Sequence, residues 1–288
     1  MSEQIIVQLN PDVPPTGSDL GVVNAARKSF GRRSEWENTK DKTVDVFIDG
    51  YERVLTNTNF KGVLKDKDKR LLEFLARGMT AGDFEEFLDR VSDEGAWNSG
   101  YISNEGGNKE ELTKSLWEWR NTPTHDTPFN HSFFSFEIKA PIFVNRHLVK
   151  HEYQIMSEYS RRYITDDVEF YQHKYRSKAV DVKQGSGGVH ENSCVWQIEV
   201  DARNSDSIDT YNRMITDGIA PEQARGHLPQ DLMTAWTWSG TLGAFANMCK
   251  LRLSPDTQYE TRLVAQQVYE ELKKQFPVSA PLLVEGVL

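Results

Sequence analysis

Basic and polar side chains are most densely grouped between residues 146 and 163. This stretch contains Arg146-His147, Lys150-His151-Glu152 and Glu158-Tyr-Ser160-Arg161-Arg162. A guanidinium group matches two oxygens of a phosphate and a lysine adds a point charge, so several such groups in one pocket suit an anionic ligand. Exposed charges are often only solvated surface, which leaves the alternative that each arginine alone is structural. The grouping predicts an anion site.

Two smaller polar groups occur later in the chain. One is Gln223-Ala-Arg225-Gly-His227-Leu-Pro229, and the other is the pair Asn247 and Arg252. On a helix these two positions, five residues apart, project at nearby but different angles. Together with the first cluster, they predict a pocket that several segments build around a phosphate-bearing ligand.

The sequence gives less support for a metal site or for a nucleophilic residue. His125 and His131 are six residues apart across a proline. That spacing is poor for two ligands of one metal, and we predict no metal site. Cys194 and Cys249 form no CxxC pair and are interpreted as buried structural residues. Ser160 as a nucleophile would need an adjacent base, which the sequence does not establish.

The composition narrows the class of protein. With 288 residues the chain forms one large domain or two small ones, and it can bury a sizeable core without disulfides. Its net charge of −9 argues against a general binder of duplex nucleic acid, although a local basic cluster can still hold a small anion. No apolar run approaches the length that crosses a membrane, and the first residues lack a signal-peptide pattern. Only two cysteines occur, so we expect a cytoplasmic protein.

Secondary-structure patterns place the first polar cluster shortly after a strand. Residues 134–139 alternate apolar and polar side chains, as a half-buried strand does. Ala140-Pro141 then breaks the strand, and a helix is predicted over 142–151 because proline is favourable at a first helical position. Another helix is predicted from the N-cap pair Ser18-Asp19 to Phe30.

Most of the other predicted elements are helices. They lie near 42–55, 68–77, 82–91, 109–121, 207–218, 221–225, 232–251 and 258–276, with strands near the N-terminus and at 195–200. These patterns predict an α+β fold in which helices dominate and the sheet is small.

Several motifs, in the same order, resemble the core of the flavin-dependent thymidylate synthases. They are His125-Asp-Thr127-Pro-Phe-Asn130-His131, Ala140-Pro-Ile-Phe-Val144, Lys150-His151-Glu152 followed after seven residues by Ser160-Arg-Arg162-Tyr163, Ala224-Arg225-Gly-His-Leu228-Pro229, and Asn247-Met-Cys-Lys-Leu251-Arg252. Ala25-Ala26-Arg27-Lys-Ser29-Phe30 also looks like the family's first helix. The resemblance implies an α+β fold with a small, mostly antiparallel sheet flanked by helices. It also implies one domain over residues 1–288, with insertions at about 33–108 and about 172–206.

The chain departs from the family pattern mainly at positions that the resemblance places beside the flavin. Lys150-His151-Glu152 stands where the family has Arg-His-Arg, Asn130 replaces a glutamate and Thr241 replaces an asparagine. One unit of charge about 4 Å from a phosphate is worth roughly 1–4 kcal/mol, so Glu152 would weaken an anion site at an unchanged position. Arg161 stands where the family has a small residue and could restore positive charge nearby.

The resemblance implies a role for each matching position. Arg252 would be catalytic, because it would lie near the pyrimidine and stabilise the negative charge that develops there. The residues implied in substrate binding are His147, Lys150, Glu158, Ser160, Arg161, Arg162, Arg225 and Arg252. Those implied in cofactor binding are Thr127, Asn130, Lys150, His151, Glu152, Glu158, Thr241 and Asn247.

By resemblance, the chain is an FAD-dependent enzyme that methylates C5 of dUMP to give dTMP, with methylenetetrahydrofolate and NADPH as co-substrates. It would act as a homotetramer. Two alternatives stay open. One is a related flavin-dependent enzyme that leaves a methyl or hydroxymethyl group on UMP or dCMP, and the other is a non-catalytic nucleotide-binding homologue.

Overall fold

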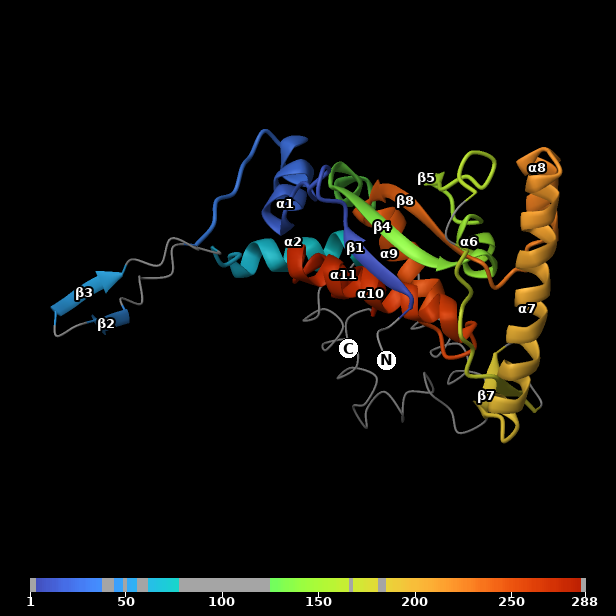
Figure 1. Ribbon diagram of the computed structural model, residues 1–288. Coiled ribbons are helices and arrows are strands. Elements are labelled where there is room, and N and C mark those ends of the chain that lie inside the picture. Colours follow the sequence, from blue (N-terminus) through green and yellow to red (C-terminus); the bar gives the residue numbers. More distant parts are fainter. Residues whose placement is uncertain are drawn as a thin grey trace, which may run out of the picture. The chain divides into compact units, whose positions relative to one another are not determined.

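The computed structural model describes residues 4–37, 44–48, 51–55, 62–77, 125–165, 168–180 and 185–285 (Figure 1). The chain forms two compact units. Residues 1–16 and 132–285 make up the first, called here the sheet unit, and residues 17–131 and 286–288 make up the second, called the helical-pair unit.

A four-stranded antiparallel sheet is the centre of the sheet unit. Its strands are β1 (Ile6–Leu9), β4 (Phe133–Pro141), β8 (Met233–Thr241) and β5 (Gln154–Glu158), in the order β1-β4-β8-β5. Phe136 of β4 lies opposite Trp238 of β8, which in turn lies opposite Met156 of β5. The α+β fold with a small antiparallel sheet is therefore confirmed, as is the strand predicted over 134–139.

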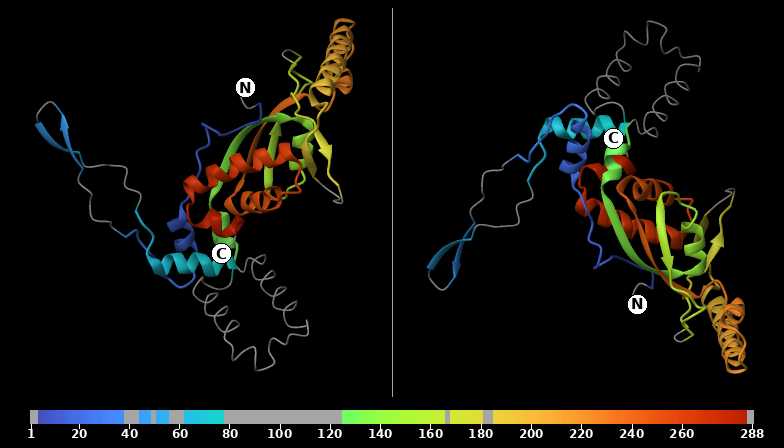
Figure 2. Two further views of the ribbon diagram at one scale, coloured as in Figure 1. Left: turned by 90° about the horizontal axis from the view of Figure 1, so that it is seen from below. Right: turned by 90° about the horizontal axis from the view of Figure 1, so that it is seen from above.

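One face of this sheet forms the core. The alternation that predicted β4 places Phe134, Phe136 and Ile138 on a single face, and all three are buried. Helices α9 (Leu242–Arg252), α10 (Tyr259–Gln275) and α11 (Ser279–Val284) belong to the same unit, and α9 and α10 lie on one face of the sheet (Figure 2). Phe245 of α9 meets Phe136 and Trp238 edge-on, with ring centroids 5.0 and 5.2 Å apart. Such edge-to-face contacts add to the area that these rings bury.

Both long strands continue directly into helices. β4 leads into α6 (Ile142–Leu148), and β8 leads into α9, whose N-terminus is capped by the Thr241 hydroxyl accepting from Ala244 N–H at 3.2 Å. Because the two strands are antiparallel, these helices start at opposite ends of the sheet. An 11-residue helix is about 16 Å long, so α9 can bring its C-terminal residue Arg252 back toward α6.

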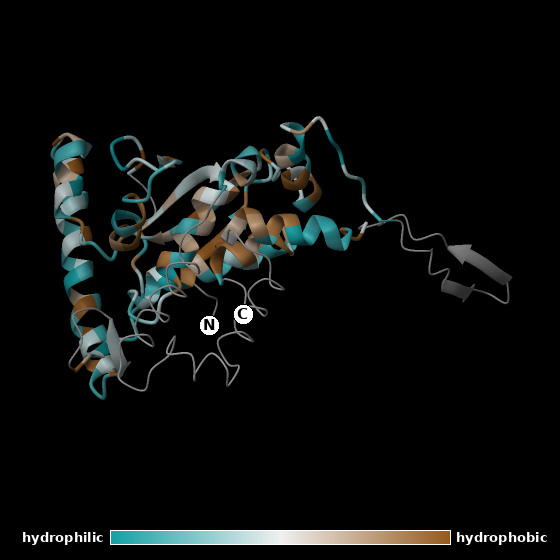
Figure 3. Cartoon of the chain, turned by 180° about the vertical axis from the view of Figure 1, so that it is seen from behind, coloured by the Kyte–Doolittle hydropathy of each residue, from teal (hydrophilic) through white to brown (hydrophobic). Residues whose placement is uncertain are grey.

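The other part of the sheet unit contains one long helix. α7 (Ser193–Thr216) is followed by the short α8 (Pro221–Ala224) and the 3-10 turn η2 (Arg225–His227), and the hairpin β6 (Arg176–Lys178) and β7 (Ser186–Val189) precedes it. Figure 3 shows that α7 is mostly hydrophilic, whereas α9 is hydrophobic along most of its length. α9 is thus a core helix and α7 a surface helix.

The helical-pair unit is built on α1 (Asp19–Lys28), α2 (Asp66–Arg77) and the 3-10 turn η1 (Thr127–His131). The predicted cap of α1 is confirmed, because the Ser18 hydroxyl accepts from Gly21 N–H at 3.2 Å. A buried ion pair joins the two helices, with Arg27 Nη2 and Asp68 Oδ1 2.6 Å apart. The unit also contains the antiparallel hairpin of β2 (Val44–Ile48) and β3 (Tyr51–Leu55).

Three sequence-based predictions of secondary structure are wrong. The paired strands β2 and β3 replace the helix predicted near 42–55, because their valine, phenylalanine, isoleucine and tyrosine residues favour a strand. The strand predicted at 195–200 is part of α7. Its Trp196 and Ile198, which would share one face of a strand, are 54% and 71% exposed, so their alternation does not mark a buried strand face. The first half of the helix predicted over 232–251 is β8, where threonine and tryptophan side chains favour a strand.

The other helix predictions hold where the structure describes them. Those at 68–77 and 258–276 correspond to α2 and α10, and the one at 142–151 ends earlier, at Leu148. Those at 207–218 and 221–225 correspond to the end of α7 and to α8. The helices predicted at 82–91 and 109–121 lie outside the described residues. The extent of a single domain and the bounds of its insertions stay predictions.

Candidate functional site

A pocket of about 390 Å³ in the sheet unit collects side chains from segments far apart in the sequence. We call it the arginine pocket. Its walls come from α6, the end of β5 with the loop after it, α8 with η2, and the start of β8. The charged residues that line it are Arg146, Glu158, Arg161, Glu222 and Arg225. Three guanidinium groups facing two carboxylates leave the pocket with positive charge available for an anion.

Four of the predicted substrate-binding residues meet in this pocket. Glu158, Ser160, Arg161 and Arg225 all line it. The Glu158 carboxylate accepts a hydrogen bond from the Thr234 hydroxyl at 3.0 Å, which holds it in place at the pocket wall. A hydroxyl, a fixed carboxylate and arginine forks together can bind a phosphate and the hydroxyl groups of a sugar.

A second group of predicted residues forms a hydrogen-bonded cluster that we call the histidine cluster. It comprises the predicted residues His147, His151 and Arg252 together with Thr261, which the sequence analysis did not single out. Arg252 Nε donates to His151 Nε2 at 2.9 Å, and His147 Nδ1 lies 3.0 Å from the Thr261 hydroxyl. Arg252 does not belong to the described lining of the arginine pocket. Two predicted substrate residues, His147 and Arg252, therefore lie in a different place of the sheet unit from the four that line the arginine pocket.

The histidines of this cluster are held neutral near pH 7. Burial, then the charge of Arg252 and then that of His147, together lower the pKa of His151 to about 4. Burial and Arg252 also lower the pKa of His147, and burial lowers the pKa of Arg252. Because arginine only donates, the 2.9 Å contact requires an unprotonated Nε2 on His151. The neutral ring thereby fixes the direction of the guanidinium group.

Several predicted residues lie outside both groups. Arg162 has its guanidinium carbon 5.4 Å from the centre of the Tyr163 ring, and Lys150 and Glu152 are exposed. Asn247 is exposed between two buried neighbours on α9, as expected of a side chain offered to a ligand. Thr241, predicted to line the flavin, caps α9.

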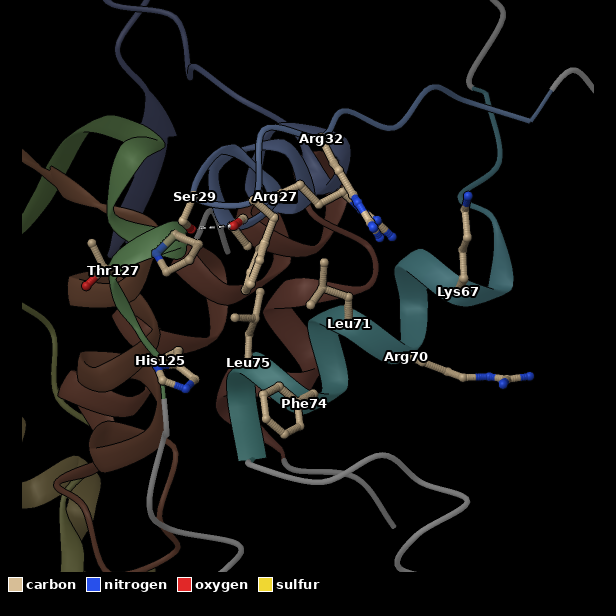
Figure 4. A pocket seen from close by; sticks show the side chains of 13 residues that line it. Arg27, Ser29, Arg32, Lys67, Arg70, Leu71, Phe74, Leu75, His125 and Thr127 are labelled. Carbon is tan, nitrogen blue, oxygen red and sulfur yellow. Dashed lines mark hydrogen bonds between the residues drawn. The ribbon is translucent and has the colours of Figure 1, made fainter.

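The two remaining predicted cofactor residues belong to the helical-pair unit. Asn130 Nδ2 in η1 donates at 3.3 Å to the carbonyl of Asp126, the residue before η1. Thr127 lines a pocket of about 720 Å³ between α1, α2 and η1, which we call the α1–α2 pocket and which Figure 4 shows from close by.

Sequence reasoning missed several residues of the arginine pocket. Arg146 was part of the first polar cluster but received no role, and Glu222, Asn145 and Gln230 were not singled out. A helical spacing could have identified two of them, because Ile142, Asn145 and Arg146 follow the i, i+3, i+4 pattern that places side chains on one face. No local pattern marks Glu222 or Gln230.

Comparison with known proteins identifies a family and close relatives. The family described as thymidylate synthase complementing protein matches residues 15–278. A flavin-dependent thymidylate synthase from Ehrlichia ruminantium (strain Gardel) is 32% identical over 203 residues, which cover 68% of this chain and 68% of that protein. Another, from Wolbachia pipientis wMel, is 34% identical over 170 residues, which cover 57% of this chain and 60% of that protein.

Solved structures share the fold. The crystal structure of a UMP/dUMP methylase, PolB from Streptomyces cacaoi, bound with 5-Br dUMP superposes with a TM-score of 0.62 at 22% identity, covering 96% of this chain and 93% of that one. The same methylase bound with 5-Br UMP gives a TM-score of 0.62 at 21% identity, with coverage of 98% and 95%.

Proposed function

Because the chain belongs to the thymidylate synthase complementing protein family, whose relatives here are flavin-dependent thymidylate synthases, we propose that it methylates C5 of dUMP in a flavin-dependent reaction. The observation that carries the proposal is the arginine pocket. It gathers Ser160, Arg161 and Arg225 beside a fixed Glu158, as a nucleotide phosphate and sugar would require. Methylenetetrahydrofolate is the proposed one-carbon donor and NADPH the proposed reductant.

The proposed phosphate ligands are the arginines of the pocket. Arg225 stands at the start of η2, and Arg161 follows Ser160 in the loop after β5. Two guanidinium forks from different segments can bind different phosphate oxygens, which fixes both the position and the direction of the nucleotide. Glu158 is held by Thr234 and can accept a hydrogen bond from the sugar or the base, so it adds selectivity without adding affinity for the anion.

The chain also presents donors that fit a flavin. Lys150 and Asn247 are exposed at the ends of α6 and along α9, and their amino and amide groups suit the carbonyl and phosphate oxygens of FAD. A flavin held here would supply the reducing hydride for the one-carbon transfer, and NADPH would supply the electrons that reduce it again. Within the sheet unit we assign the proposed flavin contacts to Lys150, His151 and Asn247.

Arg252 is the proposed catalytic residue. Methylation at C5 needs electron density at that carbon, and a cation near the pyrimidine oxygen stabilises the negative charge that develops as the carbon reacts. The neutral His151 ring orients the Arg252 guanidinium through the 2.9 Å hydrogen bond and brings no competing positive charge. His147 is oriented in the same way by Thr261.

The decisive test is the product formed from each nucleotide. The purified protein is incubated with FAD, NADPH, methylenetetrahydrofolate and, separately, dUMP, UMP or dCMP, and the product masses are read. We expect a methyl gain on dUMP, formed much more slowly by Arg252→Gln and at the normal rate by Arg203→Gln, a matched exposed arginine on α7. The absence of any modified nucleotide would favour the non-catalytic homologue.

A second candidate function rests on the solved structures and on the altered triplet. The protein from Streptomyces cacaoi is described as a UMP/dUMP methylase, and Glu152 changes the charge expected beside the flavin. A chain of this family could therefore act on UMP or dCMP, or leave a hydroxymethyl group. Preferred turnover of UMP or dCMP, or a hydroxymethyl product, would establish this function instead.

The proposed partners are small molecules and further copies of the chain. We expect a homotetramer in the cytoplasm and no binding of duplex nucleic acid, which agrees with the net charge of −9. None of the helices in the described residues is long and apolar enough to span a bilayer. The mass in solution, measured by light scattering, tests the expected tetramer.

A further inference from the structure

His173 contacts the segments that form the arginine pocket, although it does not line the pocket itself. It lies between β5 and β6, within the predicted insertion at about 172–206, and the proposed function gives it no role. Its side chain is only 16% exposed, so the contacts of the ring are largely shielded from solvent. A shielded polar side chain that joins several segments can set the distance between them.

The first contact is with the pocket wall that precedes β8. His173 Nε2 lies 3.1 Å from Asp231 Oδ1. An ionised carboxylate only accepts hydrogen bonds, so the imidazole Nε2 carries a proton and donates it to this contact. Asp231 stands between Gln230 and Leu232, which both line the pocket. The hydrogen bond therefore fixes the backbone between two residues of the wall.

The second contact is with α6, which forms another wall of the pocket. The His173 ring is stacked on Phe143 of α6, with ring centroids 5.6 Å apart and an interplanar angle of 21°. The first N–H groups of a helix have no partner inside the helix. In α6 the N–H of Ile142 donates to the Leu232 carbonyl at 2.9 Å, and the N–H of Phe143 donates to the Gln230 carbonyl at 3.3 Å. His173 thus contacts both walls where backbone hydrogen bonds join them.

The third contact is with α7. His173 N–H donates to Gln197 Oε1 of this helix at 2.8 Å, and α7 leads through α8 into η2, which carries Arg225. Two more rings hold the imidazole, because Tyr175 is stacked on it at 4.9 Å and Tyr171 meets it edge-on at 4.8 Å. The ring therefore has little freedom to rotate, and its Nε2 stays directed at the carboxylate.

From these contacts we propose that His173 is a positioning residue for the nucleotide phosphate, acting through Asp231 and Phe143 on the spacing of the pocket walls. The inference rests on the function proposed above, in which the arginine pocket holds the phosphate. Arg146 lies on α6 three residues after Phe143, so the stack on Phe143 also orients an arginine of the pocket. Guanidinium forks bind a phosphate well only when their spacing matches its oxygens. Loss of the His173 contact then weakens phosphate binding and leaves the reacting step unchanged.

The test compares two probes that differ only in the phosphate. Dissociation constants of the full-length protein are measured for dUMP by calorimetry and for deoxyuridine by its competition with dUMP. His173→Phe keeps a ring for the stack and removes the donor. We expect dUMP to bind about three- to tenfold more weakly, the range for one hydrogen bond, while deoxyuridine binds as before. KM for dUMP rises by the same factor and kcat is retained.

Variants of the partner separate positioning from stability. Asp231→Leu should match His173→Phe, and the double variant should lose no more than either single one, because both changes break the same bond. Asp231→Asn keeps an oxygen that accepts from His173 and should bind dUMP as the unaltered protein does. The matched control is His190→Phe, because His190 accepts from Asn192 N–H at 3.1 Å within its own loop and does not line the pocket.

Several outcomes would overturn the inference. They are unchanged dUMP affinity in a folded His173→Phe, an equal loss for dUMP and deoxyuridine, and additive losses in the double variant. Circular dichroism checks folding, and if His173→Phe does not fold, the comparison of Asp231→Leu with Asp231→Asn decides in the same way.

The two proposals can fail separately. The binding measurements need no turnover, so a loss of affinity confined to the phosphate-bearing probe supports the role of His173 even if no nucleotide is methylated. Methylation of dUMP by the unaltered protein, with unchanged dUMP affinity in His173→Phe, would instead uphold the reaction and reject the positioning role.

Discussion

The arginine pocket and the histidine cluster both belong to the sheet unit, but their charged side chains differ in exposure to solvent. The arginine pocket is open, and it places the exposed Arg146 and Arg225 and the half-buried Arg161 next to carboxylates. The histidine cluster is partly buried, and its one cation, Arg252, is held by a ring whose pKa is lowered to about 4. Exposed charges attract and position a ligand over a distance, whereas a buried, oriented cation acts at short range on charge that develops during a reaction.

This difference predicts separate kinetic roles. The arginine pocket should govern how tightly the nucleotide binds, and the histidine cluster how fast it reacts. Mutations in the two places should therefore change different kinetic constants, and a shared effect would show that the two groups form one site.

Arg252→Gln tests the cluster and has the largest expected effect. Removing a group that stabilises developing negative charge costs about 10²–10³ in kcat, while the nucleotide dissociation constant changes little. The measurement is steady-state turnover of dUMP together with calorimetry of dUMP binding. A large loss of affinity with unchanged kcat would assign Arg252 to phosphate binding and remove the contrast between the two places.

Arg225→Gln tests the pocket. A charge-assisted hydrogen bond contributes about 1.5–3 kcal/mol, so we expect nucleotide affinity to fall roughly 10- to 150-fold with kcat largely retained at saturation. Affinity in the unaltered protein should also fall as salt is raised, because exposed charges are screened. Arg203→Gln, an exposed arginine paired with Glu199 on α7, is the control and should bind normally.

The His151 ring of the histidine cluster should take up its proton at an unusually low pH. The folded-state pKa of His151, about 4, lies below the unfolded value of about 6.5, so the unfolded chain binds the proton more tightly. The stability that His151 contributes is present above about pH 6.5 and is lost as the pH falls toward 4. The proton NMR signal of the His151 ring should not titrate between about pH 5.5 and 8. A midpoint near 6.5 would mean that the ring does not hold Arg252.

The motifs located much of the arginine pocket in advance. Glu158, Ser160 and Arg161 are neighbours in sequence, and Arg225 belongs to a second motif, so the resemblance could name all four. It could not show that Arg252 bonds to His151, because that contact depends on α9 folding back from the far end of β8. β8 also continues into α9 without a break, and this continuity led to the wrong prediction of a single helix over 232–251.

The α1–α2 pocket could not be predicted from the sequence. Arg32 and Lys67 lie in distant segments and belong to none of the family motifs, although His125, which also lines the pocket, begins one. What brings the first two together is the ion pair between Arg27 and Asp68, which is a tertiary contact across 41 residues. Long-range pairs of this kind leave no periodic signal in the chain.

Glu222→Gln has the smallest expected effect and sharpens the account of the arginine pocket. Glu222 lines the pocket with the arginines, and its negative charge opposes a bound phosphate. Removing an exposed charge of this kind is worth about 0.3–1 kcal/mol, so dUMP should bind roughly two- to fivefold more tightly, with kcat unchanged. Glu199→Gln on the exposed face of α7 controls for the change in net charge and should have no effect. Weaker binding in Glu222→Gln would mean that this carboxylate contacts the nucleotide directly or orients an arginine, and the pocket would then recognise its ligand by hydrogen-bond geometry as well as by charge.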